Sequence, residues 1–409
     1  MPLNDLKTGV YQNLIMIKKI KETIHESADE MIEFARQLIR IPSITCQEKD
    51  LADCVANRMK RLEFANVTVD DMGSVTGVVG NHGKRILFDS HMDTVAVRNP
   101  QSWRFDPFGG IISEGKLFGR GTTDMKCALA AAVYAGSAVK KLGNECPNTM
   151  IISASVMEEQ FEGEALRQIC KTDPTKPDFV IICEPTALGL SLGNMGRALI
   201  IVETWGIAAH GSSPNLGENA IYKMLPIIQR VEALNRQLAD ENSESGSIAV
   251  TNIESQAESL NSIPAICRIF LDRRLKGGID RQQVEKEMNR LLKGTDAAWE
   301  FHVECGHCYT GKEVIFESVL PGWEIESTHP LTCAGIDTLQ DLTGEKPVLF
   351  KWKACTNGVA SAGELGIPTI GFGPGQIENA HMVDEYCELT DITAAAEFYA
   401  LLPFYLKDL

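Results

Sequence analysis

The chain has 409 residues, of which 44% are hydrophobic and 23% are charged, a balance typical of a globular protein large enough for two domains. Its formal net charge of −16 would repel phosphate backbones, so we expect no nucleic-acid partner. No apolar run could span a bilayer, and the N-terminus lacks the apolar core and cleavage site of a secretion signal. We therefore expect a cytoplasmic protein without a membrane partner, in which the 12 cysteines are thiols.

The first half of the chain alternates segments that are typical of helices and of buried strands. The spacing of apolar residues predicts helices over 31–39 and 51–62, and a run rich in Val and Thr predicts a hairpin over 67–79. There follow a predicted strand over 85–88, a helix of small residues over 124–142, a strand over 150–156, a helix over 165–170 and a strand over 179–183. This alternation predicts an α/β domain with a largely parallel central sheet flanked by helices.

The middle of the chain changes to another pattern. It predicts a strand over 198–204, a helix over 219–238, strands over 247–253 and 265–271, a helix over 279–292 and a strand over 299–304. This order is that of the ferredoxin-like α+β unit.

The first pattern then resumes, with a helix over 331–342, a strand over 367–371 and a helix over 392–402. The simplest interpretation is a discontinuous catalytic domain, residues 1–196 and 308–409, interrupted by an inserted domain, residues 197–307.

Acidic and imidazole side chains follow several predicted strands of the outer domain. His91 and Asp93 come just after the strand over 85–88, where open α/β sheets bind ligands. Asp93 could accept a hydrogen bond from the second ring nitrogen of His91 and fix its tautomer. The alternative is a surface loop with an incidental histidine.

Other candidates lie at separate points of the same sheet edge. Asp124 follows a glycine-rich turn and could bridge two cations, although as an isolated residue it is better explained as a helix N-cap. The adjacent pair Glu158 and Glu159 needs a cation or a raised pKa if it is buried, and means nothing on an exposed loop. Glu184 follows the strand over 179–183, where it could simply open a turn, and His381 follows a glycine-rich stretch.

Together these residues provide two imidazoles and four carboxylates around one crevice. Zinc takes His and carboxylate ligands and leaves a position open for water in catalytic sites, whereas calcium and magnesium prefer oxygen ligands alone. The two histidines therefore favour zinc, cobalt or manganese.

At this point the sequence resembles a known family. The ordered motifs are HMDTV, GRGTTDMK, MEEQ, CEPT, GIAAHGSSPNLGENAI, DRRL and GIPTIGFGPG followed by AH. They resemble those of the dinuclear zinc metallopeptidases, which include aminoacylases, acetylornithine deacetylase, succinyl-diaminopimelate desuccinylase and glutamate carboxypeptidase. Residues 102–110, 272–275 and 353–359 look closest to a bacterial branch of hydrolases linked to selenium-dependent metabolism.

The resemblance implies an amidohydrolase that cleaves an N-acyl amino acid or a peptide by means of a water bridging two divalent metals. By motif, one metal would have the ligands His91, Asp124 and Glu184, and the other would have His381, Asp124 and Glu159. Glu158 would be the general base and acid, and Asp93 would orient His91. The inserted domain would be a lid and the surface of a homodimer, across which His210 reaches the partner's site. The substrate would be held by Arg274, Asn261, Thr356, Asn357 and Gly358.

Some positions depart from the family pattern. Cys127 stands where Gly is usual, Asn357 stands where Asp is common, and Glu162-Gly163 replaces small residues. None of these departures removes a metal ligand, but they leave the identity of the substrate undetermined. Arg274 suggests a substrate carboxylate, and its alternative is a structural salt bridge with Asp272.

Two other functions compete with this reading. A thiol-disulfide oxidoreductase could use Cys305 and Cys308, although the residues that follow them form poor helix. A non-catalytic relative that only binds metal would keep the fold but would be free to lose Glu158.

Overall fold

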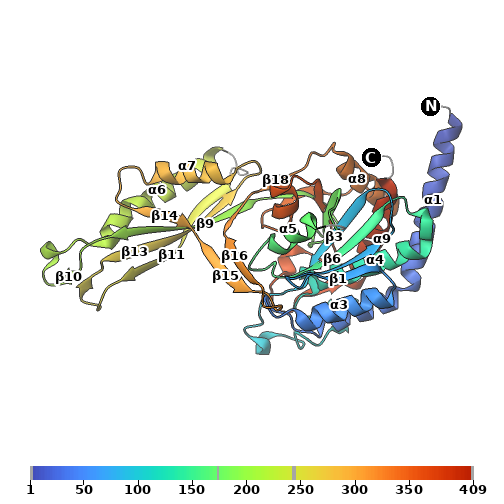
Figure 1. Ribbon diagram of the computed structural model, residues 1–409, viewed down its shortest axis with the longest axis horizontal. Coiled ribbons are helices and arrows are strands. Elements are labelled where there is room, and N and C mark those ends of the chain that lie inside the picture. Colours follow the sequence, from blue (N-terminus) through green and yellow to red (C-terminus); the bar gives the residue numbers. More distant parts are fainter. Residues whose placement is uncertain (1–2, 173–174, 242–245, 407–409) are drawn as a thin grey trace.

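The computed structural model describes residues 3–172, 175–241 and 246–406. Figure 1 shows two lobes of unequal size, with both chain termini on the larger one. Each lobe has a sheet and a buried hydrophobic cluster of its own. Within the described ranges, no helix has both the length and the apolar character needed to cross a membrane.

The larger lobe is built on a nine-stranded sheet, in the order β1-β2-β6-β3-β7-β20-β8-β18, with β19 also paired to β8. Its four central strands, β6, β3, β7 and β20, are parallel to their neighbours within this group, whereas β1, β2 and β18 pair antiparallel, so the sheet is mixed. The strands are β1 (Ala65–Val69), β2 (Val75–Val79), β3 (Arg85–His91), β6 (Thr149–Ser155), β7 (Phe179–Ile182), β8 (Leu190–Asn194), β18 (Trp323–Glu324), β19 (Leu349–Trp352) and β20 (Thr369–Gly371).

Helices flank this sheet, as the sequence predicts. They are α1 (Leu3–Glu26), α2 (Ala28–Ile39), α3 (Lys49–Arg61), α4 (Cys127–Leu142), α5 (Glu164–Lys171), α8 (Pro330–Thr343) and α9 (Leu389–Tyr405). α4 is almost wholly buried because its many alanines let it lie close to both the sheet and α9. The prediction that this helix begins at Asp124 was wrong: the regular helix begins at Cys127, and Asp124 has φ −125° and ψ 88°.

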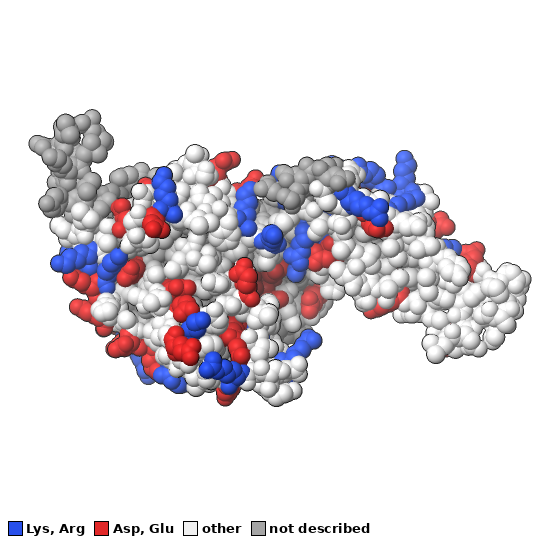
Figure 2. All heavy atoms as spheres, turned by 180° about the vertical axis from the view of Figure 1, so that it is seen from behind, with Lys and Arg blue, Asp and Glu red and all other residues white. Residues whose placement is uncertain are grey.

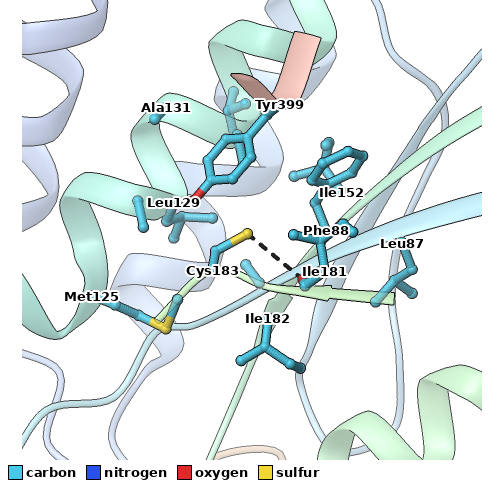
Figure 3. Close-up of a cluster of buried hydrophobic side chains, with 14 of the residues drawn as sticks. Leu87, Phe88, Met125, Leu129, Ala131, Ile152, Ile181, Ile182, Cys183 and Tyr399 are labelled. Carbon is cyan, nitrogen blue, oxygen red and sulfur yellow. Dashed lines mark hydrogen bonds between the residues drawn. The ribbon is translucent and has the colours of Figure 1, made fainter. Parts of the chain in front are cut away.

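The core between the sheet, α4 and α9 is shown in Figure 3. The Tyr399 ring meets the ring of Phe88 edge-on at 5.5 Å between centroids, and its hydroxyl donates to the carbonyl of Phe372 at 2.8 Å. Each fully buried large apolar side chain of this kind contributes about 1.5–3 kcal/mol. This core fixes the strands from whose ends the acidic and imidazole residues project.

The smaller lobe confirms the ferredoxin-like unit. Its strands pair in the order β11-β13-β9-β14, all antiparallel, and β17 also pairs with β9. Its elements are β9 (Gly196–Trp205), α6 (Ala220–Glu241), β11 (Gly246–Gln256), β13 (Ile266–Leu275), α7 (Arg281–Leu291), β14 (Ala298–Phe301) and β17 (Val319–Leu320). Along β9 every second residue is buried, so one face of the sheet packs on the helices and the other stays open.

Short strands complete the two lobes. They are β4 (Ile111–Ser113), β5 (Lys116–Phe118) and β21 (Tyr386–Glu388) in a three-stranded sheet, β10 (Ala209–His210) with β12 (Ser262–Ile263), and β15 (Val303–His307) with β16 (Glu313–Glu317). The return of the chain to the larger lobe is gradual: Cys308 and Phe316 lie in the larger core, yet β17 still pairs with β9. The domain division at residues 196/197 and 307/308 stays a prediction.

Candidate metal centre

The carboxyl ends of three adjacent strands bring the predicted ligands to one edge of the main sheet. His91 is the last residue of β3, Glu158 and Glu159 follow β6, and Glu184 follows β7. Because β3 lies between β6 and β7 and all three are parallel, these side chains share one crevice.

His91 lies at the centre of this group and is buried. Its Nε2 lies 2.8 Å from Asp124 Oδ1, 3.4 Å from Glu184 Oε1 and 4.0 Å from Glu158 Oε2. Its Nδ1 lies 2.9 Å from the carbonyl oxygen of Asp93. His91 therefore contacts both of the carboxylates that the motif assigns with it to the first metal.

His381 reaches the same group from the other side. Its Nε2 lies 3.1 Å from Asp124 Oδ2 and 3.0 Å from Glu159 Oε2. His381 itself has φ +62°, in the left-handed region, and follows a glycine-rich loop. The two oxygens of Asp124 thus point to different imidazoles, His91 on one side and His381 on the other.

Asp93 is buried beneath the site and organises its backbone. Its carboxylate accepts hydrogen bonds from the backbone N–H groups of Glu158 at 2.9 Å and Glu159 at 3.1 Å, and from the hydroxyl of Thr45 at 2.8 Å. Asp93 Oδ1 lies 3.6 Å from His91 Nδ1, beyond the carbonyl contact. Asp93 therefore fixes the adjacent Glu158 and Glu159 as well as lying beside His91.

The electrostatics of the site show an excess of buried negative charge. Burial and neighbouring carboxylates raise the pKa of Glu158 and of Glu184 well above the ordinary value, and His91 opposes the shift in both cases. Burial also works against ionisation of Asp124, but hydrogen bonds from His381 and His91 lower its pKa overall. Hydrogen bonds to Asp124 and Glu159 raise the pKa of His381 to about 10. Positive charge placed here would be stabilised.

The donor set fits divalent cations. Ligand atoms of His91, Asp124 and Glu159 lie within 4.8 Å of one another, and so do those of His91, Glu158 and Glu184. Imidazole nitrogen and carboxylate oxygen are ligands that zinc and similar metals accept. An Asp whose oxygens face two separate histidines has the disposition of a bridging ligand.

Two residues that the sequence analysis missed hold this centre from behind. Glu385 is buried, and its Oε1 accepts the backbone N–H groups of Thr123 at 2.9 Å and of Asp124 at 3.1 Å. Its Oε2 accepts from Arg120 Nη1 at 2.5 Å, while Arg120 Nη2 donates to the carbonyl of His381 at 3.2 Å. Arg120 lies within the motif that contains Asp124, and Glu385 lies four residues after His381, so their positions were the available signals.

The residues predicted to hold substrate lie in different surroundings. Thr356 and Asn357 are buried, and their side chains already bind protein groups. Thr356 donates to Asn194 Oδ1 at 2.8 Å, and Asn357 donates to Asp89 Oδ2 at 2.9 Å and accepts from the N–H of Gly163 at 2.8 Å. A side chain on Gly358 would collide with the ring of Trp323.

Arg274 lies on the open face of the sheet of the smaller lobe. It pairs with Asp272 through two contacts of 2.9 and 3.0 Å, so the alternative of a structural ion pair is realised. Arg274 is only half-buried, however. Its positive charge, like that of Arg197 at 2.7 Å, opposes the rise that burial causes in the pKa of Glu162. A role for Arg274 toward substrate stays a prediction.

His210 and Asn261 lie together but far from the metal ligands of their own chain. His210 Nε2 lies 3.3 Å from Asn261 Nδ2, and both residues are exposed. In Figure 1, β10, which contains His210, is at the end of the smaller lobe remote from β3. Within one chain the structure does not bring His210 to the centre.

The rival thiol chemistry lacks its structural context. Cys305 is exposed on β15, and Cys308 is buried against Met157, with 3.2 Å between the sulfur atoms. The chain continues from Cys308 into strand β16, whereas a reactive dithiol needs its first cysteine at a helix N-terminus. The structure therefore does not favour an oxidoreductase.

Comparisons with known proteins agree with this geometry. Residues 87–403 match the peptidase family M20/M25/M40. The chain is 33% identical over 392 residues to the uncharacterized protein YgeY of Escherichia coli K12, covering 95% of this chain and 97% of that one. It is 27% identical over 389 residues to acetylornithine deacetylase of Proteus mirabilis, covering 91% and 95% of the two chains.

Solved structures show the same fold. The metallo-carboxypeptidase Sso-CP2 of Sulfolobus solfataricus superposes with a TM-score of 0.72 at 17% identity, over 93% of this chain and 100% of that one. The YXEP protein of Bacillus subtilis, described as a dinuclear metal-binding peptidase, gives a TM-score of 0.70 at 14% identity, over 94% and 99%. The chain therefore belongs to the peptidase family M20/M25/M40 and is a metal-dependent hydrolase of amide bonds.

Proposed function

We propose that this enzyme hydrolyses an N-acyl amino acid or a dipeptide at a centre of two divalent cations, with zinc as the metal and cobalt or manganese as alternatives. The observation that carries the proposal is the position of Asp124 between His91 and His381, at 2.8 and 3.1 Å. His91 and Glu184 would complete one set of ligands, and His381 and Glu159 the other. The substrate class is supported by the P. mirabilis relative, whose name describes a deacetylase of acetylornithine.

Glu158 is proposed as the general base and acid. Bound divalent cations would acidify a water molecule and polarise the amide carbonyl. Glu158 is buried beside His91, with 4.0 Å between its Oε2 and the Nε2 of His91, where a carboxylate could take a proton from water and pass it to the leaving amine. Its backbone is held by Asp93, so the carboxylate starts from a fixed position.

The Glu158→Ala variant tests this role. We expect its turnover to fall by about a factor of a thousand or more, since proton transfer and positioning are both lost, while it still binds two metal ions per chain. Metal content by elemental analysis and turnover on a panel of N-acyl amino acids and dipeptides are the measurements. Loss of metal from the variant would show that Glu158 is a ligand and would contradict the assignment.

We also propose that the enzyme is a homodimer through the smaller lobe. Ile221, Tyr222 and Leu225 of α6 are exposed, Tyr222 to 74%. β11, which packs beside α6, pairs with β13 on one side and forms an edge of the sheet as the structure describes it, and its second half is exposed. Exposed apolar side chains next to an open strand edge favour a two-fold contact between copies.

Such a dimer would let His210 serve the partner's metal centre, where an imidazole could stabilise the developing oxyanion. The exposed pair of His210 and Asn261 supports this, since within the described ranges neither side chain contacts a predicted metal ligand of its own chain. Mixing inactive His210→Ala and Glu158→Ala chains would restore part of the activity in mixed dimers. Verified mixed dimers without any recovery would contradict action across the dimer.

The cytoplasmic location and the link to selenium-dependent metabolism stay predictions from the sequence.

A further inference from the structure

A cavity of about 730 Å³ lies where the two lobes meet, and we call it the hinge cavity. One wall comes from β8, β18 and β19 of the larger lobe, and the other from the start of β11 and the end of β13 in the smaller lobe. Its volume is in the range of about 300–1,000 Å³ that is typical of small-molecule sites. None of the predicted metal ligands lines it.

The hinge cavity carries positive charge on both walls. Arg274 and Lys276 line it from the smaller lobe, and Lys351 and Lys353 from the larger lobe, against a single acid, Glu324. Glu324 pairs with Lys351. Across the described part of the chain, Lys276 and Lys353 form no ion pair, although the whole chain has a net charge of −16.

This concentration of cations is visible from behind the molecule. Figure 2 shows Lys and Arg side chains along the region where the two lobes meet. Like charges that face each other across a cleft repel one another, and an anion between them removes that repulsion. A ligand with negative charge would therefore draw the two walls together.

Much of the remaining lining is aromatic or aliphatic, and its two tryptophans are held in place by hydrogen bonds. Trp323 and Trp352 are buried, and their ring N–H groups donate to Asn194 Oδ1 at 2.6 Å and to the carbonyl of Pro185 at 3.1 Å. Phe350 packs edge-on to Trp352 at 6.1 Å between centroids. Aromatic side chains that are already fixed cost little entropy when a ligand covers them. The cavity therefore suits a ligand with an apolar stem and a charged end.

The hinge cavity also adjoins the catalytic side of the cleft. Arg274 lines the cavity and is paired in register with Arg197 of β9, which contacts Glu162 at 2.7 Å. Glu162 lies four residues after Glu158, in the loop between β6 and α5. Arg274 thus connects the cavity with the loop of the proposed general base, and a substrate could reach both.

We propose that the hinge cavity binds a second carboxylate of the substrate, through Lys276 and Lys353, so that the enzyme prefers acidic N-acyl amino acids. This inference rests on the proposed function. Arg274 holds one carboxylate near the scissile amide, and the two lysines hold the other. Each lysine–carboxylate pair at this partly exposed cavity is worth about fivefold in binding.

The test compares acidic substrates with their neutral counterparts. The pairs are N-acetylglutamate with N-acetylglutamine and N-succinylalanine with N-acetylalanine. We expect kcat/KM for at least one acidic member to exceed that of its neutral partner by about 25-fold. In the double variant Lys276→Gln/Lys353→Gln this ratio falls to about one, while kcat/KM of the neutral substrate stays within about twofold. Lys286→Gln, an exposed lysine of α7, is the control and keeps the ratio.

The inference is overturned if the ratio of kcat/KM for acidic over neutral substrate is unchanged in the double variant, or if it does not exceed one in the wild type. Glutarate should inhibit the acidic substrate competitively, and noncompetitive inhibition would instead assign the cavity to a separate effector and overturn the substrate role. If the metal-loaded enzyme cleaves none of the four compounds, the deacylase arm of the proposed function fails. Calorimetric binding then tests the cavity by itself. The wild type must bind glutarate more tightly than acetate, and the double variant must bind glutarate about 25-fold more weakly than the wild type does. If either result is absent, the inference also fails.

Discussion

Replacing Glu385 with Gln removes one charge from a buried ion pair while nearly preserving the shape of the side chain. Glu385 joins three groups: the backbone N–H of Thr123, the backbone N–H of Asp124, and the guanidinium of Arg120, which also holds the carbonyl of His381. It therefore fixes the backbone that leads into the proposed bridging ligand, Asp124, and, through Arg120, the loop of the second histidine. Burial raises the pKa of Glu385 to about 7 despite Arg120, so the comparison belongs at pH 8, where the carboxylate is ionised.

The magnitude follows from the loss of one partner of a buried pair, which costs about 3–5 kcal/mol. Because glutamine keeps one acceptor oxygen, we expect the lower end, about 3 kcal/mol in the free energy of unfolding. Residues that orient metal ligands typically contribute about 10–100-fold to metal affinity, and we expect a weakening of this size in Glu385→Gln.

The assay is a titration of the metal-free protein with zinc in competition with a chromophoric chelator, alongside urea unfolding. Glu388→Gln is the matched control, since Glu388 is the last residue of β21, which begins directly after Glu385, but it is half-exposed and pairs with Lys116 at 3.4 Å. It should leave metal affinity unchanged. A Glu385→Gln protein that is less stable but binds both metals with full affinity would refute the positioning role and leave only a structural one.

Three further predictions concern stability, each measured by urea unfolding. Asn357→Asp places a carboxylate oxygen where an amide now donates to Asp89 at 2.9 Å. It should lower the free energy of unfolding by about 3 kcal/mol at pH 8, and by less at pH 5, where one of the two carboxylates can take up a proton. A variant as stable as the wild type at pH 8 would contradict the buried network. Gly371→Ala forces a methyl group into the buried ring of Trp352 and should cost at least about 2 kcal/mol, and an unchanged midpoint would show that the ring moves freely. Burial and then the charge of Asp93 raise the pKa of Glu48 to about 7. The folded state therefore binds this proton more tightly than the unfolded state, and wild-type stability falls as pH rises from about 4.5 to 7. Glu48→Gln should remove up to about 3 kcal/mol of this loss, and identical pH profiles for variant and wild type would contradict it.

The sequence predicted the parts of the fold that have strong periodicity. The continuous apolar run over 198–202 predicted β9, and in the structure every second residue of that run, Ala198, Ile200 and Val202, is buried. Strands β18 and β19 were missed because they are short and pair with β8, which is also short, so no alternation develops. The non-helical segment before α4 was missed because Asp124 is a suitable helix N-cap by sequence, whereas Asp124 and Met125 have non-helical backbone angles in the structure.

The site was predictable to the extent that its residues follow strands. His91, Glu159 and Glu184 converge because parallel strands end at the same edge, and this is a property of topology. Glu385 was missed because it binds backbone N–H groups, a role that no residue pattern indicates, and its position four residues after His381 was a weak signal. The hinge cavity was also hidden, because its lysines come from segments about 75 residues apart that meet only in the folded chain.

The most direct test of the central claim is the number of divalent metal ions bound per chain, measured by elemental analysis in wild type and in Asp124→Ala. A shared carboxylate between His91 and His381 predicts two ions in the wild type and the loss of both sites, with all amidase activity, in the variant. Full activity in metal-free wild type, or two tightly held ions in Asp124→Ala, would contradict it.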